Sequence, residues 1–200
     1  MNIAVYSGSF NPLHIGHLAI IKHMLEEADF DMVYLIVSPK NPLKDSISSD
    51  SARDRYTAAA AAINRHFAPN SEVLVDDIEL TMPEPHYTIR TLDALRQREP
   101  QNSFTFVMGA DSLADIRRWK DYTRILSEFG VAVFPRKGHD LTTIKTDLLK
   151  ENPVYKIQII NAPLVTVSST QIREGLMKGE DILYDRESQT RAERRSLMEA

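Results

Sequence analysis

The chain has 200 residues, of which 42% are hydrophobic, and it carries a formal net charge of -4 at pH 7 and no cysteine. This length predicts one domain, or one domain with a small appendage, and the lack of cysteine excludes disulfides and thiolate metal sites, as is typical of a reducing cytoplasm. No apolar run reaches the ~20 residues of a membrane span, no signal peptide is visible, and the acidic balance argues against a general nucleic-acid binder, so we expect a cytoplasmic protein that binds neither membranes nor nucleic acid.

Strand and helix patterns alternate along the chain. Apolar runs rich in β-branched and aromatic residues predict strands, and apolar residues at helical spacing predict helices between them. This alternation indicates an α/β fold, a Rossmann-like parallel sheet with helices on both faces and a small helical C-terminal part. The predicted strands are 3–6, 32–37, 72–75, 104–108, 131–134 and 155–160. The first predicted helix begins near residue 14, the second covers 51–67 with a cap at Asp50 or Ser51, and the third begins at a Thr88 cap. Helical residues are also predicted through Trp119 to Phe129, at 143–150 and at 168–179.

Polar loops follow four of the predicted strands. These strands end at Tyr6, Val37, Met108 and Phe134. Ligands of open parallel sheets bind outside the carboxyl ends of the strands, so we expect these four loops to line one cleft. The segment 76–86 contains two prolines and is expected to be irregular.

The segment from Tyr6 to Leu18 reads Y-S-G-S-F-N-P-L-H-I-G-H-L. A strand, a glycine-containing loop and a helix start present backbone N–H groups to an anion. His14 and His17 share one face of the predicted helix, and Gly16 leaves room for a ligand. Two imidazoles there can donate hydrogen bonds to phosphate oxygens, which helps most where charge grows in a transition state. Polar helix-start residues, or half of a zinc site that would need further ligands, are the alternatives.

A second motif, V-S-S-T-Q-I-R, occupies residues 167–173. Ser168 with Gln171 matches a capping box, which explains Ser168 as an ordinary helix cap. A cap does not explain three consecutive hydroxyl residues followed by Arg173. Together these groups can bind phosphate oxygens at a helix N-terminus.

Residues 8–17 closely resemble the G-x-F-x-P-x-H-x-G-H signature of the nucleotidyltransferase superfamily, and residues 167–173 are similar to its I-S-S-T-x-I-R motif. Members transfer a nucleotidyl group from a nucleoside triphosphate to a phosphate-bearing acceptor. H-I-G-H also occurs in class I aminoacyl-tRNA synthetases, but those are much longer chains with a lysine-bearing loop that is absent here.

The middle of the chain resembles the nicotinate-nucleotide adenylyltransferases, whereas pantetheine-phosphate adenylyltransferases and glycerol- or choline-phosphate cytidylyltransferases share the first motif. Residues 79–92 resemble the family's E-L…S-Y-T…T-L pattern, with His86 where serine is usual. Residues 106–113 resemble its F-I-x-G-x-D-x-L stretch. Trp119 falls where the family places an aromatic over the pyridine ring, a flat cation that favours an aromatic face. Further resemblances are Lys44 to the lysine of the P-P-H-K loop, Arg53 to an arginine opening the next helix, and Arg136 with Gly138 to an R-x-G segment.

The resemblance implies that the protein joins ATP and nicotinate mononucleotide into deamido-NAD and pyrophosphate, in NAD biosynthesis, with Mg²⁺ bridging the pyrophosphate oxygens. It implies in-line attack without a covalent enzyme intermediate and no metal ligand among the side chains. The implied catalytic residues are His14, His17, Lys44 and Arg173; those for ATP are Gly8, Ser9, Phe10, Ser169 and Thr170; those for the acceptor are Tyr87, Thr88, Asp111, Trp119 and Arg136.

Several alternatives stay open. The acceptor could be nicotinamide mononucleotide or phosphopantetheine, and a non-catalytic nucleotide-binding module is a different class of function. Trp119 could be a core residue, Asp111 a helix cap and Lys44 a solvated charge. The resemblance covers residues 1–184, the expected nucleotidyltransferase domain, and the charged tail 185–200 lacks the family's last apolar helix, so we expect a loose helix or disorder there. Whether the protein forms a homo-oligomer is also open.

Overall fold

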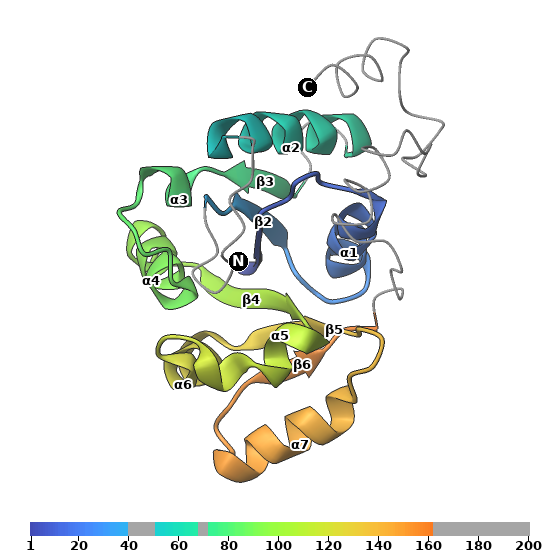
Figure 1. Ribbon diagram of the computed structural model, residues 1–200, viewed down its shortest axis with the longest axis vertical. Helices are drawn as coiled ribbons and strands as arrows, with labels where there is room; N and C mark the ends of the chain where they lie inside the picture. The colour runs from blue at the N-terminus through green and yellow to red at the C-terminus, as the bar shows by residue number, and fades with distance from the viewer. Residues whose placement is uncertain (40–50, 68–71, 162–200) are drawn as a thin grey trace.

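The structure is a computed structural model that describes residues 1–39, 51–67 and 72–161. Within these ranges, six parallel strands form one sheet in the order β3-β2-β1-β4-β5-β6 (Figure 1). The predicted α/β fold with a parallel sheet is therefore confirmed. The predicted helical C-terminal part and the tail lie outside the described residues. The strands are β1 (Asn2–Gly8), β2 (Met32–Val37), β3 (Val73–Asp76), β4 (Ser103–Gly109), β5 (Val131–Phe134) and β6 (Ile157–Ile159).

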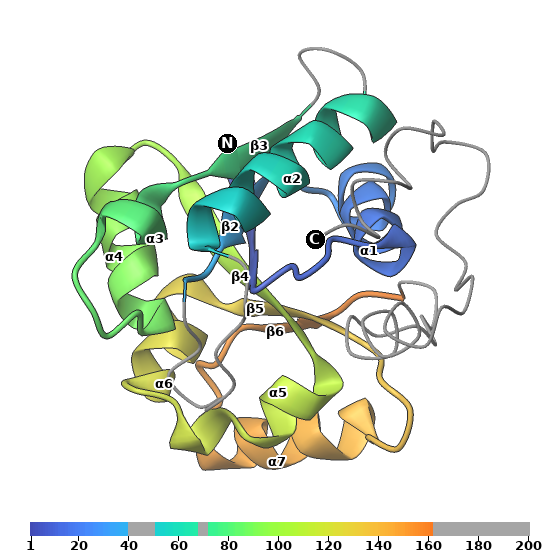
Figure 2. The ribbon, with the colours of Figure 1, turned by 45° about the horizontal axis from the view of Figure 1, so that its top comes forward.

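Helices cover both faces of the sheet (Figures 1 and 2). One apolar layer packs α1 and α2 against the sheet, and the other packs α4 and the helices that follow it. No helix in the described ranges has the length and apolar character needed to cross a bilayer. The helices are α1 (Ile15–Glu26), α2 (Ala52–His66), α3 (Ile78–Thr81), α4 (Thr88–Arg98), α5 (Ala110–Ala114), the 3₁₀ turn η1 (Ile116–Arg118), α6 (Tyr122–Arg124), the π-helical turn η2 (Ile125–Phe129) and α7 (Leu141–Glu151).

The central strand β1 shows why the sheet is covered on both faces. Ile3 and Val5 belong to the layer with α4, and Ala4 and Tyr6 belong to the layer with α1. All four are buried. Strands buried on both faces are continuously apolar, as in other parallel sheets enclosed by helices.

Four local predictions differ from the structure. The segment expected to be irregular contains α3, and α4 is capped by Tyr87 rather than Thr88, which is its first helical residue. The helical stretch through Trp119 is broken, because Asp121 adopts a left-handed backbone with φ of 51°. The helix predicted from 143 begins at Leu141, because the Asp140 carboxylate accepts from the N–H groups of Thr142 and Thr143.

The strand order reverses between β1 and β4. The chain moves outward from β1 through β2 to β3, and then returns to place β4 on the other side of β1. Such a reversal leaves a crevice at the carboxyl ends of the two strands, because the connecting segments leave in opposite directions. Gly8 ends β1 and Gly109 ends β4, so residues that follow these glycines lie at this crevice.

Candidate active site

Two histidines cap the first turn of α1. His14 is the N-cap, and its Nδ1 accepts a hydrogen bond from the Gly16 N–H at 3.2 Å. The His14 N–H in turn donates to Nδ1 of His17 at 3.2 Å. The two rings stack with their centroids 3.7 Å apart and their planes inclined by 28°. This is a capping box made of imidazoles, in which the side chains at the N-cap and three residues later satisfy backbone donors reciprocally.

The capping bonds determine where each imidazole carries its proton. Because both Nδ1 atoms accept, a neutral ring must carry its hydrogen on Nε2. Burial first, and then the nearby Arg136, lower the pKa of His14 from the ordinary 6.5 to about 4. Burial, followed by the influence of His14 and Arg136, also holds the pKa of His17 well below 6.5. Both rings are therefore neutral N–H donors at neutral pH.

Phe10 supports this pair from behind. Its ring meets His17 edge-on at a centroid distance of 5.0 Å and Tyr6 at 5.4 Å. The backbone at Phe10 is left-handed, with φ of 42°, a conformation that residues other than glycine rarely adopt. The ring also lies over Gly8, where an added Cβ would stand 3.2 Å from Phe10 Cζ. The loop between β1 and α1 is thus packed into one conformation by its own aromatic residue.

Arg136 and Asp111 border the histidine end of the crevice. Arg136 follows β5, and its Nε lies 3.7 Å from Oδ1 of Asp111, which opens α5 after β4. The guanidinium also lies over the Phe134 ring at 5.0 Å. The resemblance implied that both residues serve the acceptor. The structure places them beside the histidines and not among the residues that line the cavity described next.

A cavity is lined by the loop that follows β1, and neither His14 nor His17 is among its lining residues. Gly8 and Ser9 form one wall, and Tyr87, Thr88 and Trp119 form another. The structure thus brings together three of the five predicted acceptor residues and two of the predicted ATP residues. Seven lining residues had not been assigned a role from the sequence, namely Ser7, Ser38, Glu79, His86, Phe106, Arg118 and Lys120. Arg118 and Lys120 flank Trp119 in sequence, so charge beside a lone aromatic was a signal that could have identified them.

The N-terminus of α4 faces this cavity through Thr88. Tyr87 makes no side-chain capping bond, and the N–H groups of Arg90 and Thr91 both donate to its carbonyl. The preceding N–H groups, of Thr88 and Ile89, lie before the helical ladder begins and remain available to an anion.

Trp119 combines a packed side with a side that lines the cavity. Its ring meets Phe106 edge-on, with centroids 5.8 Å apart and planes inclined by 72°. It is half-buried, and it follows η1 just before the left-handed Asp121. The break in the helix therefore leaves the indole in a short connection rather than in a helix face.

Arg55 joins the two loops at the edge of the crevice. Its Nη1 donates to the carbonyls of Ser9 at 2.5 Å and Ser38 at 3.0 Å, and its Nη2 donates to that of Pro39 at 3.0 Å. The side chain is buried, and it shares the inner face of α2 with Ala59 and Ile63.

The family resemblance pointed to Arg53 and not to Arg55. The Arg53 side chain is 63% exposed, and its nearest charge is Asp77 at 3.7 Å. The spacing of Arg55, Ala59 and Ile63 at intervals of four was the signal that marked the inward position.

Four predicted site residues lie outside the described residues, namely Lys44, Ser169, Thr170 and Arg173. Whether the hydroxyl-rich motif reaches the crevice therefore stays a prediction. In the part of the chain that the structure describes, no three His, Asp or Glu side chains are grouped as metal ligands, so His14 and His17 have no third ligand there.

Comparisons with known proteins agree with this geometry. Residues 5–175 match the cytidylyltransferase-like family model. A nicotinate-nucleotide adenylyltransferase of Flavobacterium psychrophilum is 39% identical over 184 residues, covering 91% of this chain and 90% of the relative. The protein of the same description from Flavobacterium johnsoniae is 35% identical over 182 residues, with coverage of 91% and 90%.

The fold also matches a solved structure. It is that of Plasmodium falciparum nicotinic acid mononucleotide adenylyltransferase complexed with NaAD, with a TM-score of 0.72 and 23% identity over 90% of this chain and 86% of that one. At this identity the likeness supports the fold, while the sequence relatives identify the family. The chain therefore belongs to the nicotinate-nucleotide adenylyltransferase family, as the resemblance predicted.

Proposed function

We propose that this protein transfers AMP from ATP to nicotinate mononucleotide and releases deamido-NAD and pyrophosphate. The observation that carries this proposal is the pair of neutral Nε2–H donors on His14 and His17, which follow a loop that also lines the Trp119 cavity. A nucleotidyl transfer needs a triphosphate and an acceptor phosphate to meet at one point, and the loop through Gly8 and Ser9 adjoins both places.

On the ATP side, the histidines donate to oxygens of the α- and β-phosphates. Their lowered pKa keeps them in one protonation state across neutral pH, so each acts as a fixed dipole rather than as a proton carrier. Negative charge grows on the phosphate oxygens as the reaction proceeds, and donors already in place lower the barrier without reorganising. Arg136 adds a positive charge at the same end.

On the acceptor side, the pyridinium ring stacks on Trp119. A cationic ring is attracted to the face of an indole, especially when water is displaced. The ring carboxylate points to the free N–H groups at the start of α4, where the helix dipole favours a negative charge. Arg118 and Lys120 line the same cavity and favour an anionic nucleotide.

The reaction is a direct displacement. An oxygen of the acceptor phosphate attacks the α-phosphorus of ATP, the bond to the β-phosphate breaks, and pyrophosphate leaves with that electron pair. Positioning of the two phosphates by the shared loop supplies much of the rate, since it replaces an encounter with a fixed geometry. Lys44, Thr170 and Arg173 keep the predicted role of neutralising pyrophosphate.

Mg²⁺ suits this arrangement as a companion of ATP. The described residues offer no cage of three ligands, and Mg²⁺ is commonly held by phosphate oxygens and water with few protein ligands. Bound in that way, the ion would neutralise charge on the leaving pyrophosphate.

Incubation of the purified protein with ATP, Mg²⁺ and nicotinate mononucleotide tests the proposal, with deamido-NAD and pyrophosphate measured by chromatography. Reactions with CTP, nicotinamide mononucleotide or phosphopantetheine give the competing rates. We expect the fastest turnover with ATP and nicotinate mononucleotide. Faster turnover of phosphopantetheine, or ATP binding without any turnover, would overturn the proposal in favour of another acceptor or of a non-catalytic module.

A further inference from the structure

Glu79 and His86 are buried polar residues that the proposed mechanism does not use. Glu79 is 3% exposed and His86 is 7% exposed. The Thr91 hydroxyl donates to Oε1 of Glu79 at 2.8 Å. Oε2 of Glu79 and Nδ1 of His86 are buried and have no hydrogen-bond partner among the residues that the structure describes. Buried polar atoms are nearly always paired, because leaving one unpaired costs free energy, so these two atoms require an explanation.

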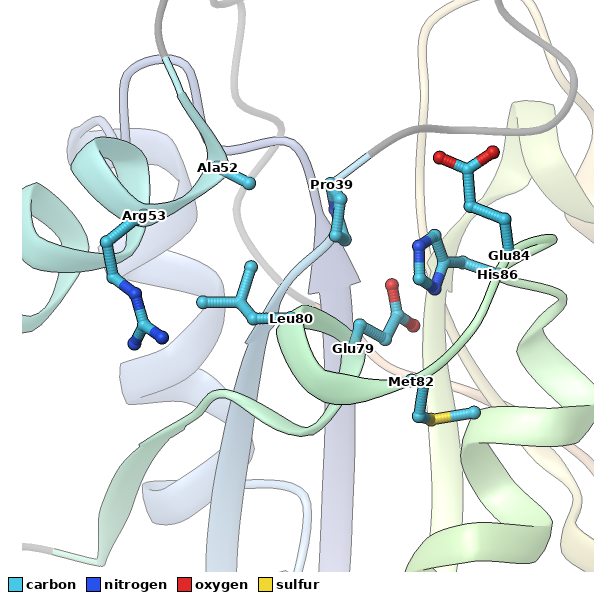
Figure 3. Close-up of a pocket in the computed structure, with 8 residues that line it drawn as sticks. All are labelled: Pro39, Ala52, Arg53, Glu79, Leu80, Met82, Glu84 and His86. Carbon is cyan, nitrogen blue, oxygen red and sulfur yellow. The ribbon is translucent and has the colours of Figure 1, made fainter.

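The position of the two side chains indicates what they are for. Both line the Trp119 cavity, which is called the acceptor cavity from here on, and both line a neighbouring cavity of about 340 Å³. They therefore form a shared wall between the two spaces. Figure 3 shows the Glu79 carboxylate, from α3, and the His86 ring, from the loop before α4, turned toward each other, while Glu84 points away.

The surrounding charges are of both signs. Arg53 of α2 and Glu84 line the neighbouring cavity, and Arg118 and Lys120 line the acceptor cavity. Among the described residues, only Glu79 and His86 line both cavities. An acceptor whose ring enters between Trp119 and the start of α4 thus has this pair as one boundary.

We propose that His86 and Glu79 form a specificity-determining pair that selects the substituent on the acceptor's ring. This inference rests on the proposed function. The two ring nitrogens of His86 can face two partners at once, Oε2 of Glu79 on one side and a ring carboxylate on the other, and a nitrogen that carries a hydrogen donates to either oxygen. His86 then stands between two carboxylates and pairs with both, which favours the acid form of the mononucleotide.

The amide form of the mononucleotide differs from the acid form in its hydrogen-bond donors. A carboxamide offers two N–H donors, and a carboxylate offers none. Without His86, the buried Glu79 carboxylate faces the cavity, where it repels an acid and accepts hydrogen bonds from an amide. His86 occupies the position at which the family pattern has serine. The preference of this chain thus depends on a residue that differs from its family.

The test compares His86→Ala, His86→Gln and Glu79→Gln with the wild type and with His66→Ala, a control on the exposed face of α2. Trp119 is the only tryptophan, so its fluorescence reports mononucleotide binding without turnover. Binding and KM are measured for nicotinate and nicotinamide mononucleotides, and KM for ATP serves as the internal reference.

We expect His86→Ala to weaken the binding of nicotinate mononucleotide about tenfold or more, the effect of a hydrogen bond to a charged group. Binding of the amide form should be unchanged or stronger, and KM for ATP should change little. His86→Gln keeps an N–H donor and should restore part of the acid preference. Glu79→Gln removes the carboxylate with which His86 pairs and should lower the preference for the acid, by less than His86→Ala does. His66→Ala should match the wild type.

Thermal unfolding shows which variants are folded, and His86→Gln, which is closer in size to histidine, replaces His86→Ala if the latter is not. An acid-to-amide ratio that stays at the wild-type value in folded His86 variants would overturn this inference and leave the proposed function standing. A wild-type protein that neither binds nor uses a mononucleotide would overturn both.

Discussion

The two walls of the crevice are built in different ways. The phosphate wall is one continuous segment, residues 8–17, in which His14 and His17 satisfy each other's backbone. The acceptor wall is assembled from three separate elements, namely α3, the start of α4 and the η1 connection. It also contains buried atoms, on Glu79 and His86, that have no partner within the described ranges. We assign the reacting phosphates to the wall whose capping bonds are satisfied, and we assign the choice of acceptor to the wall with unpartnered groups.

This difference predicts which variants separate catalysis from folding. A local motif can be exchanged for another local motif that keeps the same backbone bonds. An assembled wall has no such replacement, because each residue comes from a different element. The largest effects on rate should therefore come from the phosphate wall without loss of stability.

Replacement of the histidines by ordinary capping residues is expected to give the largest effect. Asparagine is a favoured N-cap residue and glutamine a favoured partner three residues later, so His14→Asn and His17→Gln should preserve α1. Each removes an Nε2–H donor and should lower kcat about 10²–10³-fold. Steady-state kinetics and thermal unfolding on the same samples measure the two effects.

His23→Ala, on the same helix and outside the crevice, is the matched control for these variants. It should retain wild-type kcat. If His14→Asn and His17→Gln are folded and fully active, the histidines are capping residues only, and the catalytic role given to them is wrong.

Arg55 joins the phosphate wall to the loop that follows β2, and its removal should change the shape of the crevice. Arg55→Ala leaves the carbonyls of Ser9, Ser38 and Pro39 without this donor. We expect a loss of about 3 kcal/mol in the free energy of unfolding and a higher KM for both substrates, because buried carbonyls without partners are costly. Urea unfolding and kinetics measure these changes.

Arg53→Ala is the control for this prediction, two residues away on the same helix. The exposed Arg53 should change stability by no more than about 0.5 kcal/mol. Arg55→Lys should be intermediate, since an ammonium lacks the planar fork that reaches several carbonyls. Equal effects of Arg53→Ala and Arg55→Ala would refute the distinction between the two arginines.

Trp119→Ala should weaken the binding of the acceptor and not that of ATP. Loss of the indole face should raise KM for nicotinate mononucleotide about tenfold and leave KM for ATP unchanged. Trp119→Phe keeps an aromatic ring and should recover most of the affinity. A rise in both KM values would mean that Trp119 supports the crevice through Phe106 rather than through the ligand.

The same contrast explains what could be predicted from the sequence. The sheet, the histidine turn and the family follow from patterns within short segments, such as the apolar run of β1 and the loop that follows it. The His–His capping box, in contrast, could not be read from spacing, because histidine is not among the usual capping residues. Its geometry depends on Phe10 in a left-handed conformation behind it.

The acceptor wall was predicted only in part, for a physical reason. Tyr87, Thr88 and Trp119 could be identified through resemblance, but Glu79 and His86 matter because α3 and the following loop bring them to the same cavity. That depends on tertiary packing, which no local pattern encodes. Arg55 was missed for a related reason, because a buried arginine is unusual and the family pattern drew attention to Arg53.

The last expected effect is a dependence of stability on pH that originates in the phosphate wall. Well above pH 6.5 both histidines are neutral in the folded and unfolded states, and they contribute no pH dependence. As the pH falls below 6.5, the unfolded chain takes up protons that the folded chain refuses, because the pKa of His14 is lowered to about 4 and that of His17 is also lowered. Stability should therefore decrease from pH 6.5 toward pH 4.

The double variant His14→Asn with His17→Gln isolates this contribution from that of the carboxylates. Between pH 7 and 4.5 the wild type should lose about 2 kcal/mol more than the double variant, after allowance for solvent screening. Urea unfolding at a series of pH values measures the difference. Equal losses would mean that the histidines accept protons in the folded state at their ordinary pKa, and a protonated ring could not accept the Gly16 and His14 N–H groups through Nδ1. The capping box therefore requires the pH dependence, and absence of the pH dependence would contradict the capping box.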